Sequence, residues 1–401
     1  MDKQMSFEVV GKEPDPVRHK SCRRMLVGPW RNQPEEYEGY NGFVGWAGVN
    51  RLRSGRWFVV FNSGYWHSSP PWTPEIKASL VKDPAFQAAH KHRIELGRPD
   101  VYAPRGGRIH IMHSDDEGQT WSEPLTLADT ELSDLHPTLI EQSDGTLLCT
   151  FTSVGLPDVH TARHILSSDG GKTWTAPIDS APGNTGSFSN GSTILLANGT
   201  IAWAIEARSG TKEHPESSIG IYLSSDRGRA FERVSLVTTD HPMYEPTLAE
   251  LPDERLMLMC RREGDIFWSQ DGGKSWTDPA GTGVEMFDPH LLVMPSGLLA
   301  CFHGSYKKHG LRVILSRDQG KTWRGPGDHY GYAVDPSVYG YSHPMLLEDG
   351  TVYIVYIHTG GHRTADARTN ALWASRVRIH EAGDGIDLLA APGPVPNEVS
   401  V

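Results

Sequence analysis

The chain has 401 residues, of which 22% are charged and 38% hydrophobic, and its formal net charge is −11 at pH 7. This composition is that of a folded globular protein, and the acidic balance argues against nucleic acid or an anionic membrane as a partner, since both favour a basic face. No apolar run approaches the roughly 20 residues that a membrane-spanning helix needs. No signal peptide is visible over Met1–Val10, so we expect either a cytoplasmic protein or, after removal of a leader, a periplasmic or secreted one.

Short apolar strings separated by turn residues run along most of the chain and predict strands, with little helix. The first strings lie at Ser6–Val10 and Cys22–Val27, and the next begins at Trp46, ahead of the turn at Ser54. A long insertion, 68–104, then follows the second strand of this unit and contains a helix-like stretch at 74–96. We expect the insertion to form a wall or lid over a central pocket.

Further units start with a polar residue ahead of a turn and an apolar strand. This pattern predicts six inner strands. The first begins at Trp46, and the others begin at His136, Asn190, Glu245, Asp288 and His343. The spacing to the turn is eight residues, except at His343, where it is shorter. Each string with its turn predicts a hairpin.

An eight-residue phrase, Ser-x-Asp-x-Gly-x-x-Trp, returns at intervals of 45 to 57 residues. Its copies are 114–121, 167–174, 224–231 (ending in Phe231), 269–276 and 316–323. Units of this length fit the four-stranded blades of a β-propeller. The chain is therefore predicted to be all-β and a single domain over 1–401. We favour six blades, with an N-terminal strand closing the last; seven blades, with one built from both termini, is the alternative.

The phrase resembles the Asp box, or BNR repeat, of the sialidase superfamily, and the resemblance extends from about Trp46 to about Arg376. It implies an Asp-box β-propeller. That superfamily includes sialidases, other glycosidases, polysaccharide lyases that act at uronates, and non-catalytic binding proteins, so the fold does not decide the function.

In an up-and-down blade, the Asp boxes lie on one face, and the starts of inner strands and the ends of second strands lie on the other. We expect the functional site on this second face. Its candidates at strand starts are the six residues given above. The loops after second strands add Tyr65, Trp66, His67, Arg105, Arg208, Arg261, Arg262, His303, Tyr306, His358, His362 and Arg363.

Arginines end two neighbouring second strands, at Arg208 and at the pair Arg261 and Arg262. Together they predict a clamp for a carboxylate sugar, either sialic or uronic acid; inter-blade salt bridges are the alternative. The other predicted substrate-binding residues are Trp46, Tyr65, Trp66, Arg105, Asn190, His303 and His343. The expected ligand is an acidic oligo- or polysaccharide, and the oligomeric state is left open.

Sialidases use an arginine triad that begins with an Arg-Ile-Pro string, with a Tyr nucleophile supported by Glu and an Asp acid/base. Here the first inner strand reads Gly45-Trp46-Ala47, which argues against a sialidase proper. The strings 63–67 and 104–108 resemble propellers that attack ulvan-type and rhamnose–glucuronate glycans. Rhamnosidases of that group have a His near the start of the first blade, and this chain has none there.

Elimination from a uronate requires neutralisation of its carboxylate, a base and an acid. We expect His136 and His67 as base and acid, with Tyr341 as the alternative acid and Arg208 at the carboxylate. The prediction is a lyase for uronate-containing, possibly rhamnose-linked, glycans. A glycoside hydrolase, either rhamnosidase or exo-sialidase, is the alternative, and a non-catalytic glycan-binding propeller is the second.

No cofactor is required by this chemistry. A divalent cation held by Glu245 and Asp288 is a tentative prediction. The alternative is that both carboxylates bond backbone amides or the nearby arginines. The cysteines Cys149, Cys260 and Cys301 fall in second strands, where we expect buried packing rather than redox or metal chemistry.

Overall fold

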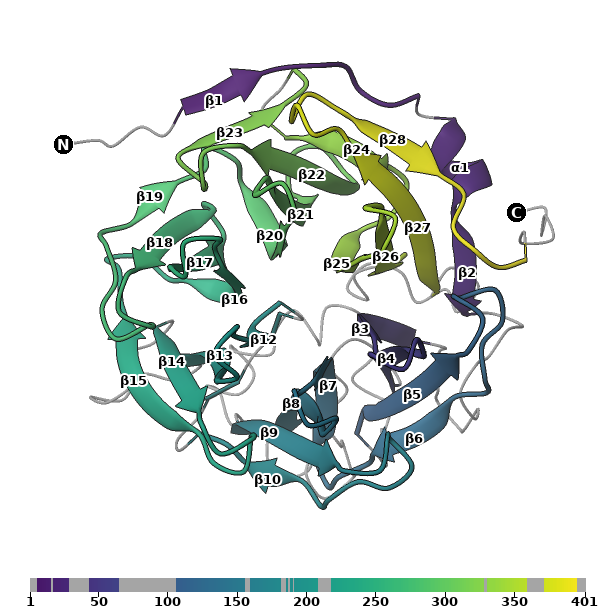
Figure 1. Ribbon diagram of the computed structural model, residues 1–401, viewed down its shortest axis with the longest axis vertical. Coiled ribbons are helices and arrows are strands. Elements are labelled where there is room, and N and C mark those ends of the chain that lie inside the picture. Colours follow the sequence, from purple (N-terminus) through teal and green to yellow (C-terminus); the bar gives the residue numbers. More distant parts are fainter. Residues whose placement is uncertain are drawn as a thin grey trace, which may run out of the picture.

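The computed structural model describes residues 6–15, 17–28, 43–64, 106–155, 159–181, 185–186, 188–189, 191–207, 218–327, 330–358 and 371–394. These residues form six β-sheets arranged as blades around a central axis (Figure 1). The six-bladed prediction is confirmed and the seven-bladed alternative is wrong. The insertion 68–104 lies outside the described residues.

Each of the first three blades runs from an inner strand at the axis to an outer strand at the rim. Blade 1 contains β3 (Phe43–Arg51), β4 (Trp57–Gly64), β5 (Arg108–Ser114) and β6 (Leu125–Ala128). Blade 2 contains β7 (Ser133–Glu141), β8 (Leu147–Gly155), β9 (Val159–Ser167) and β10 (Ile178–Asp179). In blade 3 the inner position is shared by β11 (Thr185–Gly186) and β12 (Thr193–Leu195), which both pair with β13 (Ile201–Ala207), followed by β14 (Ile219–Ser224) and β15 (Glu232–Val237).

The remaining blades follow the same order. Blade 4 contains β16 (Tyr244–Glu250), β17 (Leu256–Arg261), β18 (Asp265–Ser269) and β19 (Ala280–Gly281). Blade 5 contains β20 (Met286–Val293), β21 (Leu299–Ser305), β22 (Leu311–Ser316), β23 (Thr322–Gly325) and β24 (Tyr332–Asp335). Blade 6 contains β25 (Gly340–Leu346), β26 (Val352–Ile357), β27 (Leu372–Ile379) and β28 (Ile386–Leu389).

The N-terminal segment ties the last two blades together. Strand β1 (Ser6–Val9) pairs in parallel with β23 of blade 5, and β2 (Arg24–Val27) pairs antiparallel with β27 of blade 6. The helix α1 (Arg18–Cys22) lies between them at the rim (Figure 1). Because the two ends of the chain meet in one sheet, the ring is closed by hydrogen bonds. Of the two N-terminal segments expected to complete the last blade, Cys22–Val27 does so, and Ser6–Val10 pairs with blade 5 instead.

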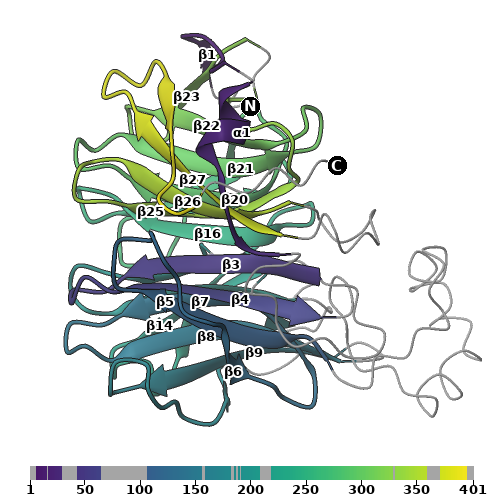
Figure 2. The ribbon, with the colours of Figure 1, turned by 90° about the vertical axis from the view of Figure 1, so that its right-hand side faces the viewer.

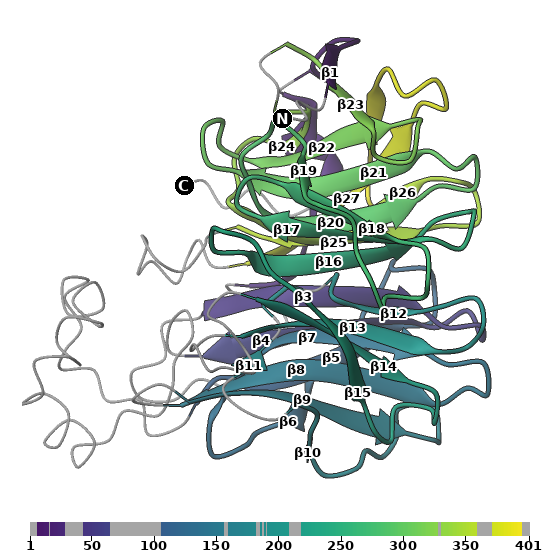
Figure 3. The same ribbon diagram turned by 90° about the vertical axis from the view of Figure 1, so that its left-hand side faces the viewer.

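Strand pairing defines two faces of the disc, seen edge-on in Figures 2 and 3. In blade 2, Ser133 at the start of β7 pairs with Val154 at the end of β8. At the other end of the blade, Glu141 pairs with Leu147, which pairs with Ser167 at the start of an Asp box. The starts of inner strands therefore lie opposite the Asp boxes.

The Asp boxes are turns that satisfy their own polar groups. In the first box, the Ser114 hydroxyl donates to Asp116 (2.7 Å) and accepts from the Gly118 amide (2.8 Å), and the Thr120 amide donates to Asp116 (2.8 Å). The serine-to-aspartate and glycine-to-serine bonds recur in all five boxes. Gly118 has φ +82°, and a Cβ there would lie 3.0 Å from the ring of Trp57, so this turn requires glycine.

The core lies between blades rather than in one centre. Val49, Phe61, Tyr353 and Val355 pack across the junction of blades 1 and 6. All four cysteines are buried free thiols, and burial raises the pKa of Cys149, which supports the packing role. Within the described part of the chain, no helix has the length and apolar character needed to cross a membrane.

Candidate active site

Five inner strands carry a β-bulge near their start, and a residue with positive φ lies at each one. The pairing register shifts there in blades 1, 2, 4, 5 and 6. The residues with positive φ are Trp46 (42°), His136 (52°), Glu245 (47°), Asp288 (44°) and Tyr341 (51°). Left-handed backbone costs energy for any residue with a Cβ, and such strain gathers at functional sites. We call this set the bulge ring.

Four members of the bulge ring are the predicted strand starts, and the fifth replaces one of them. Tyr341, not His343, occupies the bulge of blade 6. The string His343-Pro resembles His136-Pro and led to the wrong assignment. The spacing held the correct signal, because Tyr341 lies eight residues before Asp349, as His136 does before Asp144.

Glu245, Tyr341 and Arg261 form a hydrogen-bonded trio across blades 4 and 6. The Tyr341 hydroxyl donates to Glu245 Oε1 at 2.8 Å, and the Arg261 guanidinium donates to the same oxygen. Arg261 Nη1 also lies 3.4 Å from the Tyr341 oxygen. Glu245 and Tyr341 are 5% and 7% exposed, so these two members of the trio are nearly shielded from water, whereas Arg261 is partly exposed.

The charges in the trio are mutually dependent. Burial, together with the Glu245 carboxylate, raises the pKa of the Tyr341 phenol well above its ordinary value. Burial opposes the charge of Arg261, but Glu245 and the phenols of Tyr341 and Tyr306 together outweigh it, and the pKa of Arg261 is raised. Tyr341 is therefore neutral at rest, and loss of its proton requires an acceptor in contact, which Glu245 provides.

Asp288 supports the trio from blade 5. Its backbone amide donates to Glu245 Oε2 at 2.8 Å, and its carboxyl accepts from the Ser342 amide at 3.1 Å. Burial, and next the charge of Glu245, raise the pKa of Asp288 well above its usual range. The surroundings of Asp288 therefore disfavour a second negative charge beside Glu245.

Three of the bonds described above occupy both oxygens of Glu245, and Asp288 binds a backbone amide. These bonds correspond to the alternative given for the tentative cation site, in which the two carboxylates bond backbone amides or a nearby arginine. Among the described residues, no group of three or more His, Cys, Asp or Glu gathers in a metal-binding arrangement.

Aromatic rings form the opposite side of the site. The imidazole of His136 stacks on the indole of Trp46, with centroids 4.4 Å apart, and its edge meets Phe188 at 5.6 Å. His136 also lies 6.2 Å from Tyr341 between ring centroids. Trp46 is 1% exposed, so it orients His136 and presents no surface of its own for a ligand, contrary to the binding role predicted for it.

A second aromatic group lies beside Tyr341, and the sequence singled out only its member Tyr306. Phe287 contacts Tyr341 (5.4 Å), Tyr339 (4.6 Å) and Tyr306 (5.2 Å) between ring centroids. Phe287 directly precedes Asp288, and Tyr339 lies two positions before Tyr341. The sequence signal for Phe287 and Tyr339 was therefore their position one or two residues before a member of the bulge ring.

Several predicted residues lie elsewhere. His303 is fully buried at the end of β21, with its pKa lowered by burial to about 4, so it is not available to contact substrate. His358 lies at the end of β26, beside Trp373. The remaining predictions lie outside the described residues: Tyr65, Trp66, His67, Arg105, Asn190, Arg208, His362 and Arg363.

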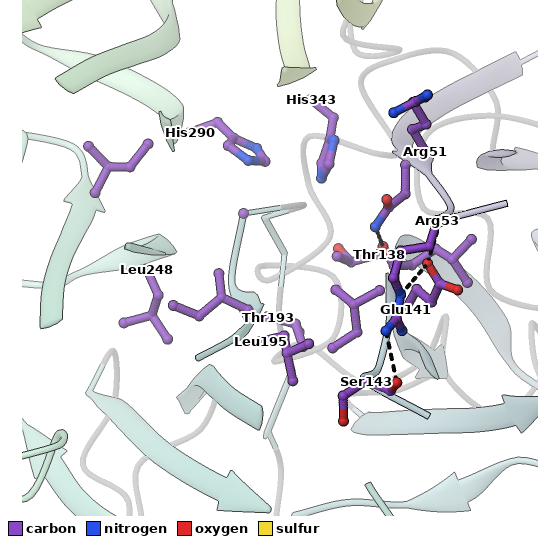
Figure 4. A pocket seen from close by; sticks show the side chains of 16 residues that line it. Arg51, Arg53, Thr138, Glu141, Ser143, Thr193, Leu195, Leu248, His290 and His343 are labelled. Carbon is purple, nitrogen blue, oxygen red and sulfur yellow. Dashed lines mark hydrogen bonds and ion pairs between the residues drawn. The ribbon is translucent and has the colours of Figure 1, made fainter. Parts of the chain in front are cut away.

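A cavity of about 570 Å³ lies at the other end of the inner strands (Figure 4). His290 and His343 point into it, and Arg51, Arg53 and Glu141 line its side near the Asp-box face. The Nδ1 atom of His343 accepts from the Val49 amide at 3.2 Å. No member of the bulge ring lines this cavity, so it is separate from the trio, and His343 belongs to it rather than to the functional face.

Known proteins similar to this chain are sialidases and a protein of unknown function. A 238-residue stretch is 25% identical to a sialidase of Bacteroides fragilis, covering 53% of this chain and 42% of that protein, less than half its length. Among solved structures, a protein of unknown function from Dyadobacter fermentans matches with a TM-score of 0.67 and 16% identity over 90% of this chain and 99% of the other. The NanB sialidase of Streptococcus pneumoniae matches with a TM-score of 0.59 and 11% identity over 86% and 70%.

These structural matches show the fold, a sialidase-like six-bladed propeller. None of them points to an ulvan lyase, a rhamnosidase or a uronate substrate. The model of the BNR repeat-like domain matches residues 104–354, which is more than half of the chain. The protein therefore belongs to the family of BNR repeat-like domains, within the sialidase-like propellers.

Proposed function

We propose that the protein is a glycoside hydrolase that uses Tyr341 as its nucleophile. The observation that carries this proposal is the 2.8 Å hydrogen bond from the Tyr341 hydroxyl to Glu245, between two buried side chains. Tyrosine serves as nucleophile in the sialidase type of glycosidase. The similarity to sialidases adds support for this class of reaction.

In the first step, the Tyr341 oxygen forms a bond to the anomeric carbon while its proton passes to Glu245. The bond from that carbon to the leaving oxygen breaks, and an acid protonates the leaving oxygen. Arg261 lies 3.4 Å from the Tyr341 oxygen and stabilises the negative charge that develops on it. In the second step, water attacks the anomeric carbon and gives a proton to the group that acted as acid. The bond from that carbon to the Tyr341 oxygen breaks, and Tyr341 recovers its proton from Glu245.

We assign the acid role to His136. Its ring centroid lies 6.2 Å from that of Tyr341, and its orientation is fixed by stacking on Trp46 at 4.4 Å. An imidazole is a suitable donor near neutral pH.

The lyase expected from the sequence remains a prediction without support from the similar proteins. In the predicted clamp, Arg261 was to hold the substrate carboxylate. Here its guanidinium binds Glu245, which favours a hydrolase over elimination.

Trapping tests the proposal directly. A panel of methylumbelliferyl glycosides, including the α-sialoside, α-rhamnoside and β-glucuronide, identifies the accepted sugar. An activated fluorinated analogue of the accepted sugar is then incubated with the protein, and the residue that carries the adduct is identified by mass spectrometry. We expect one sugar bound to Tyr341 and none in Tyr341→Phe.

Release of sugar by Tyr341→Phe at the wild-type rate would contradict the proposal. Formation of an unsaturated uronate from rhamnose–glucuronate or ulvan oligosaccharides, detected by its ultraviolet absorbance, with no glycoside hydrolysed would instead establish the lyase.

A further inference from the structure

An exposed aromatic ring with two arginines lies at the edge of the trio. Tyr306, just after β21, is 38% exposed, which is unusual for a large aromatic side chain in this protein. The guanidinium carbon of Arg262 lies 5.2 Å from the centre of its ring, and that of Arg261 lies 5.5 Å from it. These are cation–π distances.

The two arginines are consecutive in sequence but differ in their partners. Arg261 is half-buried and binds Glu245. Arg262 is exposed, and among the described residues no carboxylate pairs with it. The neighbouring cation Lys307, by contrast, is paired with Glu285 at 3.4 Å. Arg262 therefore presents a positive charge, positioned by Tyr306, that is available to an anion.

Tyr306 is coupled to the reacting groups. Burial raises the pKa of its phenol, Arg261 lowers it and Glu245 raises it, so Tyr306 senses both charges of the trio. Phe287 contacts Tyr306 and Tyr341 with centroid distances of 5.2 Å and 5.4 Å. A sugar bound over Tyr306 would therefore adjoin a sugar held at Tyr341.

Tyr306 and Arg262 together offer two kinds of recognition. An aromatic face packs against the C–H surface of a sugar ring, and an exposed guanidinium binds a carboxylate or sulfate through two parallel hydrogen bonds. We infer that Tyr306 and Arg262 form a subsite for an acidic sugar, carrying a carboxylate or a sulfate, next to the sugar that is cleaved. The position of this subsite in the reaction rests on the proposed function, whereas its binding chemistry does not.

Binding measured without turnover tests the subsite. Isothermal titration of the Tyr341→Phe protein would use a hyaluronan tetrasaccharide, its carboxyl-reduced form and a chondroitin sulfate tetrasaccharide. We expect the acidic tetrasaccharides to bind at least about tenfold more tightly than the reduced one. The comparison of hyaluronan with chondroitin sulfate separates carboxylate from sulfate recognition.

Variants in the same background locate the effect. Arg262→Ala should remove the preference for acidic ligands and leave binding of the reduced form unchanged, while Tyr306→Leu should weaken all three. Arg229→Ala, an exposed arginine in an Asp box, is the matched control and should change nothing.

The subsite is refuted if acidic and reduced tetrasaccharides bind alike, if none binds, or if Arg262→Ala and Arg229→Ala behave identically. The proposed function can fail separately: binding that depends on Arg262, together with no glycoside hydrolysed by the wild type, would leave the subsite standing and overturn the hydrolase.

Discussion

The two ends of the inner strands belong to the same repeat but are built in opposite ways. At the Asp-box end, five turns repeat one set of hydrogen bonds between serine, aspartate and glycine. At the other end, five bulges repeat one strained backbone conformation but carry five different side chains. A constant backbone with variable side chains is what a scaffold for chemistry requires, so the comparison favours the bulge end as the place of the proposed chemistry.

The largest expected effect concerns the nucleophile. Tyr341→Phe removes the nucleophilic oxygen from a buried ring. We expect kcat to fall by about a thousandfold or more, since no other described side chain is placed to act as nucleophile instead. The thermal midpoint should stay close to that of the wild type. Steady-state kinetics on the accepted glycoside and a melting curve measure both. Comparable loss in Tyr339→Phe, a neighbouring tyrosine with a ring nearly parallel to that of Tyr341, would show that the effect is only packing.

A smaller effect is expected at the proposed acid. His136→Ala should lower kcat by roughly a hundredfold, because proton donation typically contributes that much, with little change in stability. A leaving group that needs no protonation, such as a nitrophenol, should recover most of the rate. A large drop in stability with residual activity would identify His136 as a structural cap of its strand.

Acid should weaken the axial region before it weakens the Asp boxes. Burial lowers the pKa of His343 to about 4 and that of His290 well below its usual value, whereas an unfolded histidine titrates near about 6.5. The unfolded state binds more protons in that interval, so the free energy of unfolding falls as pH drops from about 6.5 toward about 4. Hydrogen bonds from Ser275 lower the pKa of Asp271 to about 2, so its stabilisation is lost only below its ordinary value of 3.8.

Urea unfolding at several pH values across this range measures how the free energy of unfolding depends on pH. His343→Gln should flatten the slope between about 6.5 and 4, and Asp271→Asn should leave it unchanged. A protein whose stability is constant over that interval would contradict the prediction.

The smallest effect is expected in a single Asp box. Asp318→Ala removes hydrogen bonds from Ser316 and the Thr322 amide in a largely exposed turn, and should lower the free energy of unfolding by about 1 kcal/mol. Activity should be unaffected, since the turn lies on the face opposite the trio. Loss of activity without loss of stability would contradict the assignment of stability to the Asp-box end and of chemistry to the bulge end.

Much of the fold was predictable because its signals are local. The Ser-x-Asp-x-Gly phrase encodes a turn whose bonds lie within four residues, and the apolar strings encode strands by alternation. Ring closure by Cys22–Val27 also followed, since a propeller lacking a strand has an unpaired edge. The bulge ring was predicted only in part. Spacing from turns identified Glu245, Asp288 and His136 as strand starts, whereas Tyr341 was expected only as an alternative acid and His343 was taken as the strand start because its string matched.

The sequence by itself favoured six blades, placed the Asp boxes opposite the starts of the inner strands and identified most of the residues at those starts, because these features belong to one repeat. Only the tertiary structure decided which of them act together. The contact between Glu245 and Tyr341 joins positions 96 residues apart, and the bond from Glu245 to the Asp288 amide joins neighbouring blades. Such contacts depend on the curvature of the closed ring, which sets how far side chains from different blades reach toward one axis.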